Sequence, residues 1–178
     1  GKNLSDRLVE SHLEEWEAHD LASQLMDTLH GAHEAGFIHG ALTPGSVMMV
    51  ERARGGHRYI ILDLGLCRLA PLIQGADSYL AMMADPALMA PELFNASSAT
   101  EKSDIYMLGQ LIYTTLAGGH PFAGISIEEV GKKHTNGELP PITDYRPDLN
   151  PEFVTWLNTL IKPNPDERPE SILEAAKL

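Results

Sequence analysis

Hydrophobic residues recur every three to four positions over several stretches of the chain, which is the spacing of one face of a helix. The longest such stripe lies between residues 14 and 35, and Gly36 follows it as a left-handed helix stop. A shorter stripe, Leu4 and Leu8, follows Asn3, a residue type that caps helix N-termini. These patterns predict two helices within the first 36 residues. The longer stripe contains Leu21, Ala22, Leu25, Met26, Leu29 and Ala32.

The second half of the chain also reads as helical. Residues 105–116 are apolar on most faces, which predicts a helix in the middle of the domain that opens at Ser103-Asp104 and ends before Gly118. Ser126 and Glu129 have the spacing of a capping box, and Asn150 with Pro151 predicts another helix start. The stripe after that start is Phe153, Trp156, Leu157, Leu160 and Ile161, and a last helix is predicted through Leu173.

A change of pattern interrupts the helices between residues 37 and 65. Two short apolar runs, 47–50 and 60–62, flank a Gly55-Gly56 turn, which predicts a β-hairpin that leads into Asp63. The sequence therefore predicts one mainly α-helical domain over residues 1–178, a helical bundle with one small β-hairpin. A chain of 178 residues is long enough to bury a substantial core.

Composition and charge narrow the functional classes. The net charge is −12, which argues against nucleic-acid binding because that depends on neutralising phosphates. Arg52, Arg54 and Arg58 form the one basic cluster, and a solvated hairpin tip explains it better than a binding patch. No apolar run is long enough for membrane insertion, and the single cysteine, Cys67, excludes a disulfide framework. We therefore expect a cytoplasmic protein in which Cys67 is an inert packing residue.

Five short motifs follow one another along the chain. They are the H-x-x-L-x-P pattern that starts at His39, Asp63-Leu64-Gly65, Ala90-Pro91-Glu92, the S-D-I-x-x-x-G pattern from Ser103, and the D-x-R-P pattern that contains Arg168. Their order and separations resemble those of the eukaryotic-type (Hanks-type) serine/threonine protein kinases. The resemblance covers the whole chain and implies the helical C-terminal lobe of that fold, with an activation-segment-like loop at about 63–92. Alanine-rich helices and short loops resemble bacterial members of the family.

Several positions depart from the family pattern. The resemblance places the catalytic aspartate at Ala41 and the arginine before it at Gly40. It places the lysine that steadies the phosphoryl group at Thr43 and the metal-binding asparagine at Ser46. None of these four side chains can do the work of its counterpart, so we expect no catalytic residue in this loop.

The nucleotide side of the family site is also missing from the sequence. No two glycines are separated by a single residue, so the chain contains no G-x-G loop, and Lys2 is the only lysine before His39. We therefore expect that the N-terminal lobe is absent and that the protein is a pseudokinase C-lobe, not an enzyme, that acts as a scaffolding or regulatory module in signalling. The alternative is a kinase lobe completed in trans, or residual nucleotide and Mg²⁺ binding through Asp63.

Asp63 is the one residue of this chemistry that the chain keeps. A functional interpretation has it bind a divalent cation, but a lone carboxylate is a poor site for one, and an aspartate also caps its own turn. We expect Asp63 and Gly65 to be vestigial, with no cofactor and no metal. A zinc site at His30, His33 and His39 is disfavoured because the sequence contains no cysteine pair and no HExxH motif.

The remaining family positions are structural. The resemblance implies that Glu92 pairs with Arg168, and that Asp104 accepts hydrogen bonds from the backbone near His39. An isolated lobe would expose the floor of the former cleft, including Leu42, Met48 and Leu64, and methionines make such a surface adaptable. We therefore expect a protein partner, or self-association, through this exposed cleft floor. The further methionines of this surface are Met49, Met82, Met83 and Met89.

Overall fold

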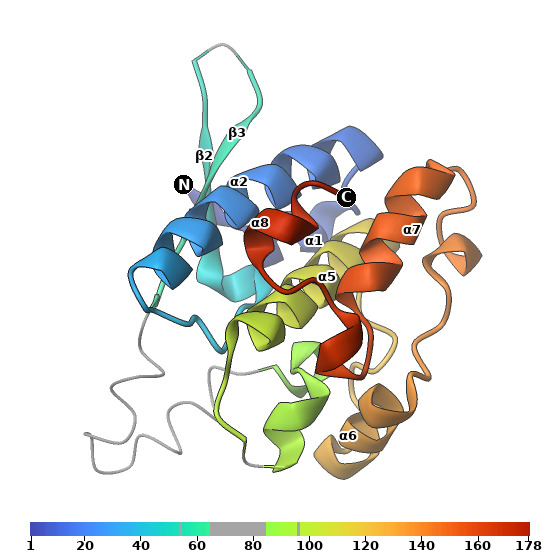
Figure 1. Ribbon diagram of the computed structural model, residues 1–178. Coiled ribbons are helices and arrows are strands. Elements are labelled where there is room, and N and C mark those ends of the chain that lie inside the picture. The colour runs from blue at the N-terminus through green and yellow to red at the C-terminus, as the bar shows by residue number, and fades with distance from the viewer. Residues whose placement is uncertain (54, 65–84, 96) are drawn as a thin grey trace.

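Helix α5 (Glu101–Ala117) runs through the centre of the computed structural model, which describes residues 1–53, 55–64, 85–95 and 97–178 (Figure 1). Every residue of α5 from Ser103 to Leu116 is buried, and this explains its nearly uniform apolar sequence. The helix begins two residues before the predicted Ser103, because Thr100 is the N-cap and forms a capping box with Ser103. It ends before Gly118 as predicted, and Gly118 is the C-cap with a left-handed φ of 76°.

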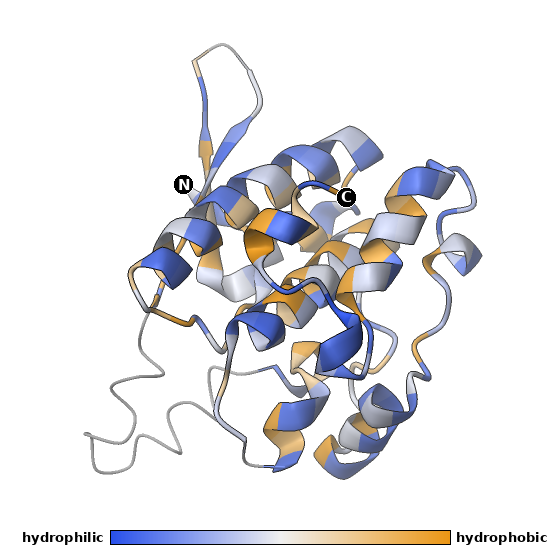
Figure 2. Ribbon diagram, in the orientation of Figure 1, coloured by the Kyte–Doolittle hydropathy of each residue, from blue (hydrophilic) through white to orange (hydrophobic). Residues whose placement is uncertain are grey.

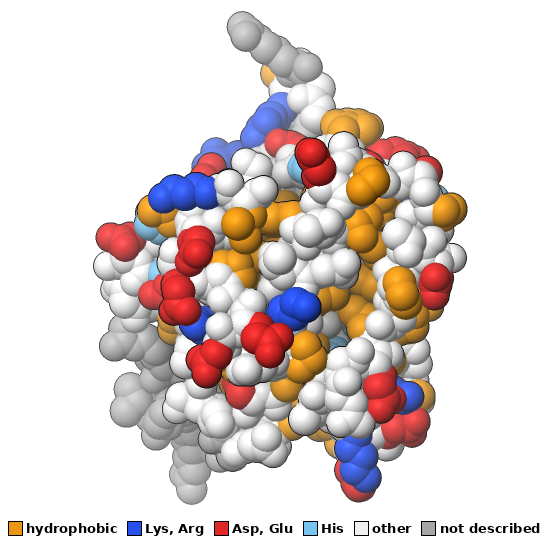
Figure 3. All heavy atoms as spheres, turned by 45° about the vertical axis from the view of Figure 1, so that its right-hand side comes forward, with side chains coloured by type: hydrophobic (Ala, Val, Ile, Leu, Met, Phe, Trp, Pro, Cys, Tyr) orange, Lys and Arg blue, Asp and Glu red, His pale blue; other side chains and the backbone are white. Residues whose placement is uncertain are grey.

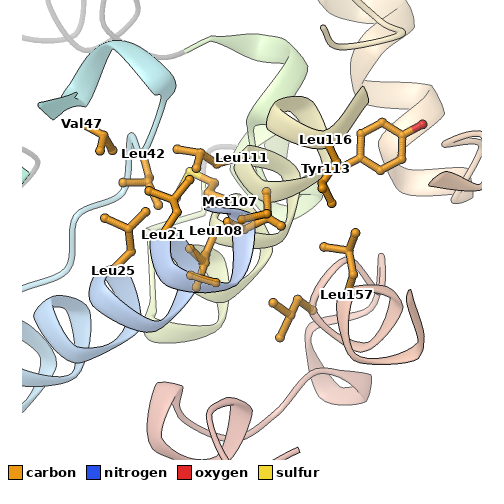
Figure 4. Packing of buried hydrophobic residues seen from close by; sticks show 14 of the residues in the cluster. Leu21, Leu25, Leu42, Val47, Met107, Leu108, Leu111, Tyr113, Leu116 and Leu157 are labelled. Atoms are coloured by element: carbon orange, nitrogen blue, oxygen red, sulfur yellow. The ribbon is translucent and has the colours of Figure 1, made fainter. Parts of the chain in front are cut away.

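Helix α2 (Glu15–Glu34) packs along α5 and confirms the long helix predicted between residues 14 and 35. Its apolar stripe faces α5, so that Leu21 and Leu25 lie against the same core as Leu108 and Leu111 (Figure 4). Its outer face is polar, and the colouring in Figure 2 shows this separation of the two faces. The same core takes in Leu42, which is fully buried.

Helices α7 (Pro151–Leu160) and α8 (Ile172–Ala175) complete the bundle around α5. Asn150 caps α7 and Pro151 occupies its first turn, as the sequence predicts. Helix α6 (Ile127–Asn136) lies on the side of the molecule away from the hairpin, and Ser126 caps it by accepting the amide of Glu129 (Figure 1). Short 3-10 helices connect these elements: η3 (Pro86–Leu88), η4 (Pro91–Asn95), η5 (Ile142–Asp144) and η6 (Pro165–Glu167).

The predicted hairpin is present as β2 (Val47–Glu51) and β3 (His57–Ile61), paired antiparallel with Val47 opposite Ile61. A third strand, β1 (Lys2–Asn3), extends it to a three-stranded sheet in the order β1-β2-β3. The expectation of a bare hairpin was therefore incomplete. A strand of two residues has no alternation to detect, and Asn3 shows in the sequence only as the cap of α1 (Leu4–Glu10), a role that it also has.

Candidate functional site

Residues 39–46 form the loop that resembles the catalytic loop of the kinase family, and we call it the catalytic loop. A buried carboxylate holds the start of its backbone in place. Asp104 is fully buried in the first turn of α5, and it accepts the backbone N–H groups of His39 at 2.9 Å and Gly40 at 2.8 Å. His33 Nε2 donates to the same carboxylate at 2.8 Å. A buried charge with three donors around it is compensated, so Asp104 ties the end of α2 and the start of the loop to the central helix.

His39 ties the loop to the strand beside it. Its Nε2 lies 3.1 Å from the carbonyl oxygen of Leu62, and its Nδ1 accepts the backbone N–H of Ala41 at 3.2 Å. Burial lowers the pKa of His39 even though Asp104 opposes the shift, so the ring is neutral at pH 7. A neutral ring with one donor and one acceptor fits both contacts. The backbone amide of Ala41 is therefore set in place, although its side chain is only a methyl group.

Thr43 and Ser46, the other two positions that depart from the family pattern, form hydrogen bonds with each other. Thr43 caps the 3-10 helix η1 (Pro44–Ser46), its hydroxyl accepting the amide of Ser46 at 3.3 Å. The hydroxyl of Ser46 in turn accepts the amide of Thr43 at 3.0 Å and donates to the Thr43 carbonyl at 2.9 Å. Ser46 is only 4% exposed. Both hydroxyls therefore serve the local fold of the loop.

Asp63 lies just beyond β3 and directly after the residue that His39 binds. The amide of Leu62 donates to the carbonyl of Ser46 at 2.8 Å, so the strand end is bonded to the catalytic loop on two sides. Asp63 has a φ of 60°, the one left-handed non-glycine among the described residues, and its side chain is exposed. An aspartate tolerates this conformation in a turn, as the sequence suggested. Gly65 lies outside the described residues.

The pair implied by the A-P-E and D-x-R-P motifs is present and nearly buried. Arg168 donates to both oxygens of Glu92, at 2.9 and 3.0 Å, and the exposed fractions of the two side chains are 0% and 17%. Arg168 also donates to the carbonyls of Lys102, Lys162 and Pro163. Burial alone would raise the pKa of Glu92, but hydrogen bonds from Arg168 and Ser103 hold it below its ordinary value. We call Glu92 and Arg168 the anchor pair.

Two of the three histidines considered for zinc form hydrogen bonds within the fold. His33 binds Asp104 through Nε2, and the ring of His39 binds Leu62 and Ala41. Among the described residues there is no group of three or more His, Cys, Asp or Glu side chains that could hold a metal ion. Cys67 lies outside the described residues. The role of His33 was missed at the sequence level because its partner is 71 positions away.

The expected cleft floor is only partly exposed. Leu42 is fully buried, so the prediction that it lies open was wrong, and Met49, 5% exposed, is a core residue and not part of an exposed surface. The reason is that the bundle and the sheet close over them: Leu42 and Met49 belong to the core shared with α2 and α5. Met48 and Met89 are half-buried, and Leu64 is 40% exposed. Met82 and Met83 lie outside the described residues.

No described helix is long and apolar enough to cross a membrane. A family model described as "Protein kinase domain" matches residues 1–177 of this chain. Two bacterial relatives are similar: the serine/threonine-protein kinase pkn3 of Myxococcus xanthus, 29% identical over 85% of the chain, and the DNA damage-responsive serine/threonine-protein kinase RqkA of Deinococcus radiodurans, 32% identical over 80%. The human hormonally up-regulated neu tumor-associated kinase is 27% identical over 95% of the chain. The chain spans 28%, 21% and 23% of these relatives' lengths.

These comparisons contradict the expectation that the protein is not an enzyme, because the relatives are named as kinases and the matching model is a kinase domain. Two steps of the reasoning that led to this expectation do not exclude an enzyme. The absent G-x-G loop and lysine were read as a missing lobe, yet the matched residues are only a small share of each relative. The loss of a general base lowers a rate by about 10²–10⁴ but does not abolish phosphoryl transfer, which rests mainly on positioning and charge neutralisation.

The observed fold agrees with this assignment: it is mainly helical, with a small antiparallel sheet. The chain belongs to the protein kinase domain family.

Proposed function

We propose that this chain is the larger lobe of a serine/threonine protein kinase, and that it transfers phosphate slowly together with a small lobe that lies outside these residues. The observation that carries the proposal is the bracing of the catalytic loop. Asp104 fixes the backbone of His39 and Gly40, and His39 fixes the strand end that carries Asp63. The loop and Asp63 are thus held in register, which is the main requirement of a reaction that depends on positioning.

The residues at the site fit a magnesium ion only when a nucleotide brings part of its ligand shell. Magnesium binds through one or two carboxylates, several waters and the phosphates of its substrate. Asp63 is exposed and offers one carboxylate, whereas Ser46 is buried and bonded to Thr43. We therefore assign Asp63 as the residue that holds the metal–nucleotide complex. Such an ion would neutralise phosphate charge.

The substrate hydroxyl that accepts the phosphate receives less catalytic assistance from this loop than from a loop with an aspartate at position 41. Ala41 cannot take its proton, so the proton leaves to solvent, and the loop contributes geometry without a base. We expect a slow enzyme, with a rate below that of a base-containing loop by about 10²–10⁴.

A substitution tests this directly. In the full-length protein that contains this chain, Ala41→Asp should raise the rate of ³²P transfer from labelled ATP to a serine substrate by about 10²–10⁴. Asp63→Asn, which keeps the left-handed turn because asparagine also adopts it, should remove transfer in both backgrounds. Transfer that is undetectable in the natural protein and in Ala41→Asp, with both correctly folded, would contradict the proposal.

Nucleotide binding is measured separately from transfer. At about a hundred times its dissociation constant, ATP with Mg²⁺ should add about 2.7 kcal/mol to the unfolding free energy, visible as a thermal shift. Asp63→Asn should lose this shift, and ADP without metal should not produce it. If the natural protein shows no shift at millimolar nucleotide, the assignment of Asp63 is wrong.

A regulatory or scaffolding contact with a protein partner is a second proposal, and it is compatible with catalysis. It is supported by the exposed apolar residues at the strand end beside the catalytic loop: Leu64 is 40% exposed and Ile60 is 37% exposed. A second copy of the chain, or the small lobe, would cover them. We expect Leu64→Asp to lower the mass measured by light scattering at high concentration, and a natural protein that stays monomeric at every concentration would exclude self-association.

A further inference from the structure

A groove of about 370 Å³ lies between α2, α7 and the C-terminal residues. Figure 3 shows the face of the molecule that carries α7, where hydrophobic side chains gather with acidic side chains around them. No residue of the catalytic loop lines this groove, so it is separate from the proposed catalytic site. Its volume is in the range of sites that hold a small ligand or a side chain.

Aromatic rings form one wall of the groove. His19 stacks on Phe153 with ring centroids 4.0 Å apart, and Phe153 stacks on Trp156 at 5.3 Å with an angle of only 11° between the rings. The indole N–H of Trp156 donates to the carbonyl of Ala175 at 2.9 Å, which fixes that ring. Met26 adds a flexible apolar surface. The wall is therefore flat, largely apolar and already in place before any ligand arrives.

Two carboxylates border this wall. Asp27 and Glu152 both line the groove and both are exposed. Within the described ranges neither side chain has an ion-pair partner, and no lysine or arginine lines the groove. The chain as a whole carries a net charge of −12. Phe153 is buried, but Trp156 is half-buried and His19 is exposed. Negative charge beside these accessible rings attracts a cation with a flat or apolar body.

We propose that this groove binds an arginine side chain presented by a basic peptide segment of a partner protein. Arginine fits better than lysine for two reasons. Its planar guanidinium can stack on the half-buried ring of Trp156, and its N–H groups can donate to the exposed carboxylate of Asp27 or Glu152. Its apolar stem can cover Met26. The net negative charge of the chain speeds the approach of a basic segment.

Tryptophan fluorescence reports on this binding. The chain has two tryptophans, and Trp16→Phe leaves Trp156 as the only one; Trp16 does not line the groove. The probe is a short alanine-based peptide with one central arginine, and its control is the same peptide with neutral citrulline in that place. The arginine peptide should shift the Trp156 emission saturably. Citrulline should bind at least about tenfold more weakly, because it is neutral and cannot form charge-assisted hydrogen bonds.

The protein side has a matched control. Asp27→Asn with Glu152→Gln should weaken binding of the arginine peptide by about tenfold, for the same reason. Asp166→Asn with Glu167→Gln removes the same amount of negative charge from exposed residues of η6 that do not line the groove, and it should change binding little. Circular dichroism checks that each variant folds. The proposal is overturned if the arginine peptide gives no saturable shift, if citrulline binds equally well, or if both double variants weaken binding alike.

Discussion

The catalytic loop and the anchor pair are both built around a buried carboxylate, but they use their other side chains differently. In the anchor pair, the arginine and the glutamate of the two motifs are both present and satisfy each other. In the catalytic loop the supporting residue, Asp104, is present, while Ala41 and Thr43 stand where the family resemblance implies charged groups. The difference follows from position: a buried charge cannot be removed without stranding its partner, whereas the half-buried side chain of Ala41 has no polar partner to lose.

The anchor pair should give the largest effect. Arg168→Ala leaves Glu92 and three backbone carbonyls without their donor, so we expect the unfolding free energy to fall by about 3–5 kcal/mol. Lys102→Ala is the control, because its partner Glu170 is 75% exposed and such a surface pair contributes about 0–1 kcal/mol. Urea denaturation measures both. Equal, small losses would mean that the anchor pair contributes no more than a surface ion pair.

The support of the catalytic loop should come next. Asp104→Asn has one acceptor oxygen for donors that now use two, and its amide group faces N–H donors. We expect a loss of about 1.5–3 kcal/mol, with faster hydrogen exchange at the amides of His39 and Gly40. Asp85→Asn, which keeps the cap of η3, should leave both measurements unchanged. Unaltered exchange at His39 and Gly40 in Asp104→Asn would show that another contact holds the loop.

A third effect depends on pH and concerns the segment before the A-P-E motif. His134 Nε2 binds the carbonyl of Ala87 at 2.9 Å, its Nδ1 lies 2.7 Å from the Tyr106 hydroxyl, and it is 1% exposed. Burial lowers the pKa of His134 to about 4, below the unfolded value of about 6.5. The folded state therefore holds this ring neutral while the unfolded state takes up a proton, so the stabilisation is complete above pH 6.5 and is lost as the pH falls toward 4.

We expect one such histidine to make the unfolding free energy fall by up to about 1.4 kcal/mol for each pH unit in this window. Denaturation curves between pH 4 and 7 give the slope. His134→Gln should flatten it, while His19→Gln, with a side chain 56% exposed, should not. His120, whose pKa burial lowers to about 3, adds to the slope in both variants. An unchanged slope in His134→Gln would place the proton uptake elsewhere.

The smallest effect should be at the loop surface. Ala41 is half-buried and its side chain carries no hydrogen bond, so Ala41→Asp should change the unfolding free energy by no more than about 0.5 kcal/mol. The same substitution has a large expected effect on phosphate transfer, and the contrast between the two measurements separates the loop's function from its stability. A loss of several kcal/mol in Ala41→Asp would show that the loop is packed too tightly to take a carboxylate.

The sequence predicted the helices well because their signals are local. The stripe of α2, the apolar run of α5 and the Asn150-Pro151 start of α7 each lie within a few turns of chain. Strand β1 was missed because two residues carry no periodicity, and the burial of Leu42 was missed because it depends on helices distant in sequence. The His33–Asp104 contact spans 71 positions, and no pattern in the sequence around either residue predicts it.

The site was predicted unevenly for a related reason. Motif spacing located Glu92, Arg168, His39 and Asp104, whose contacts are present in the structure. It also located the replaced positions Ala41, Thr43 and Ser46, but the inference from those replacements to an inactive protein failed. A side chain that is missing from a motif indicates which assistance the chemical step lacks. Family membership, by contrast, is judged from the match over the whole chain.

The reciprocal hydrogen bonds between Thr43 and Ser46 affect which substitutions this loop can accept. Each residue closes the turn for the other, so a single exchange at either position leaves the remaining hydroxyl with an unmatched neighbour in a nearly closed space. A lysine at position 43 or an asparagine at position 46 would therefore disturb the turn unless both residues changed together. Ala41 makes no reciprocal side-chain bond, so its substitution does not depend on a second one.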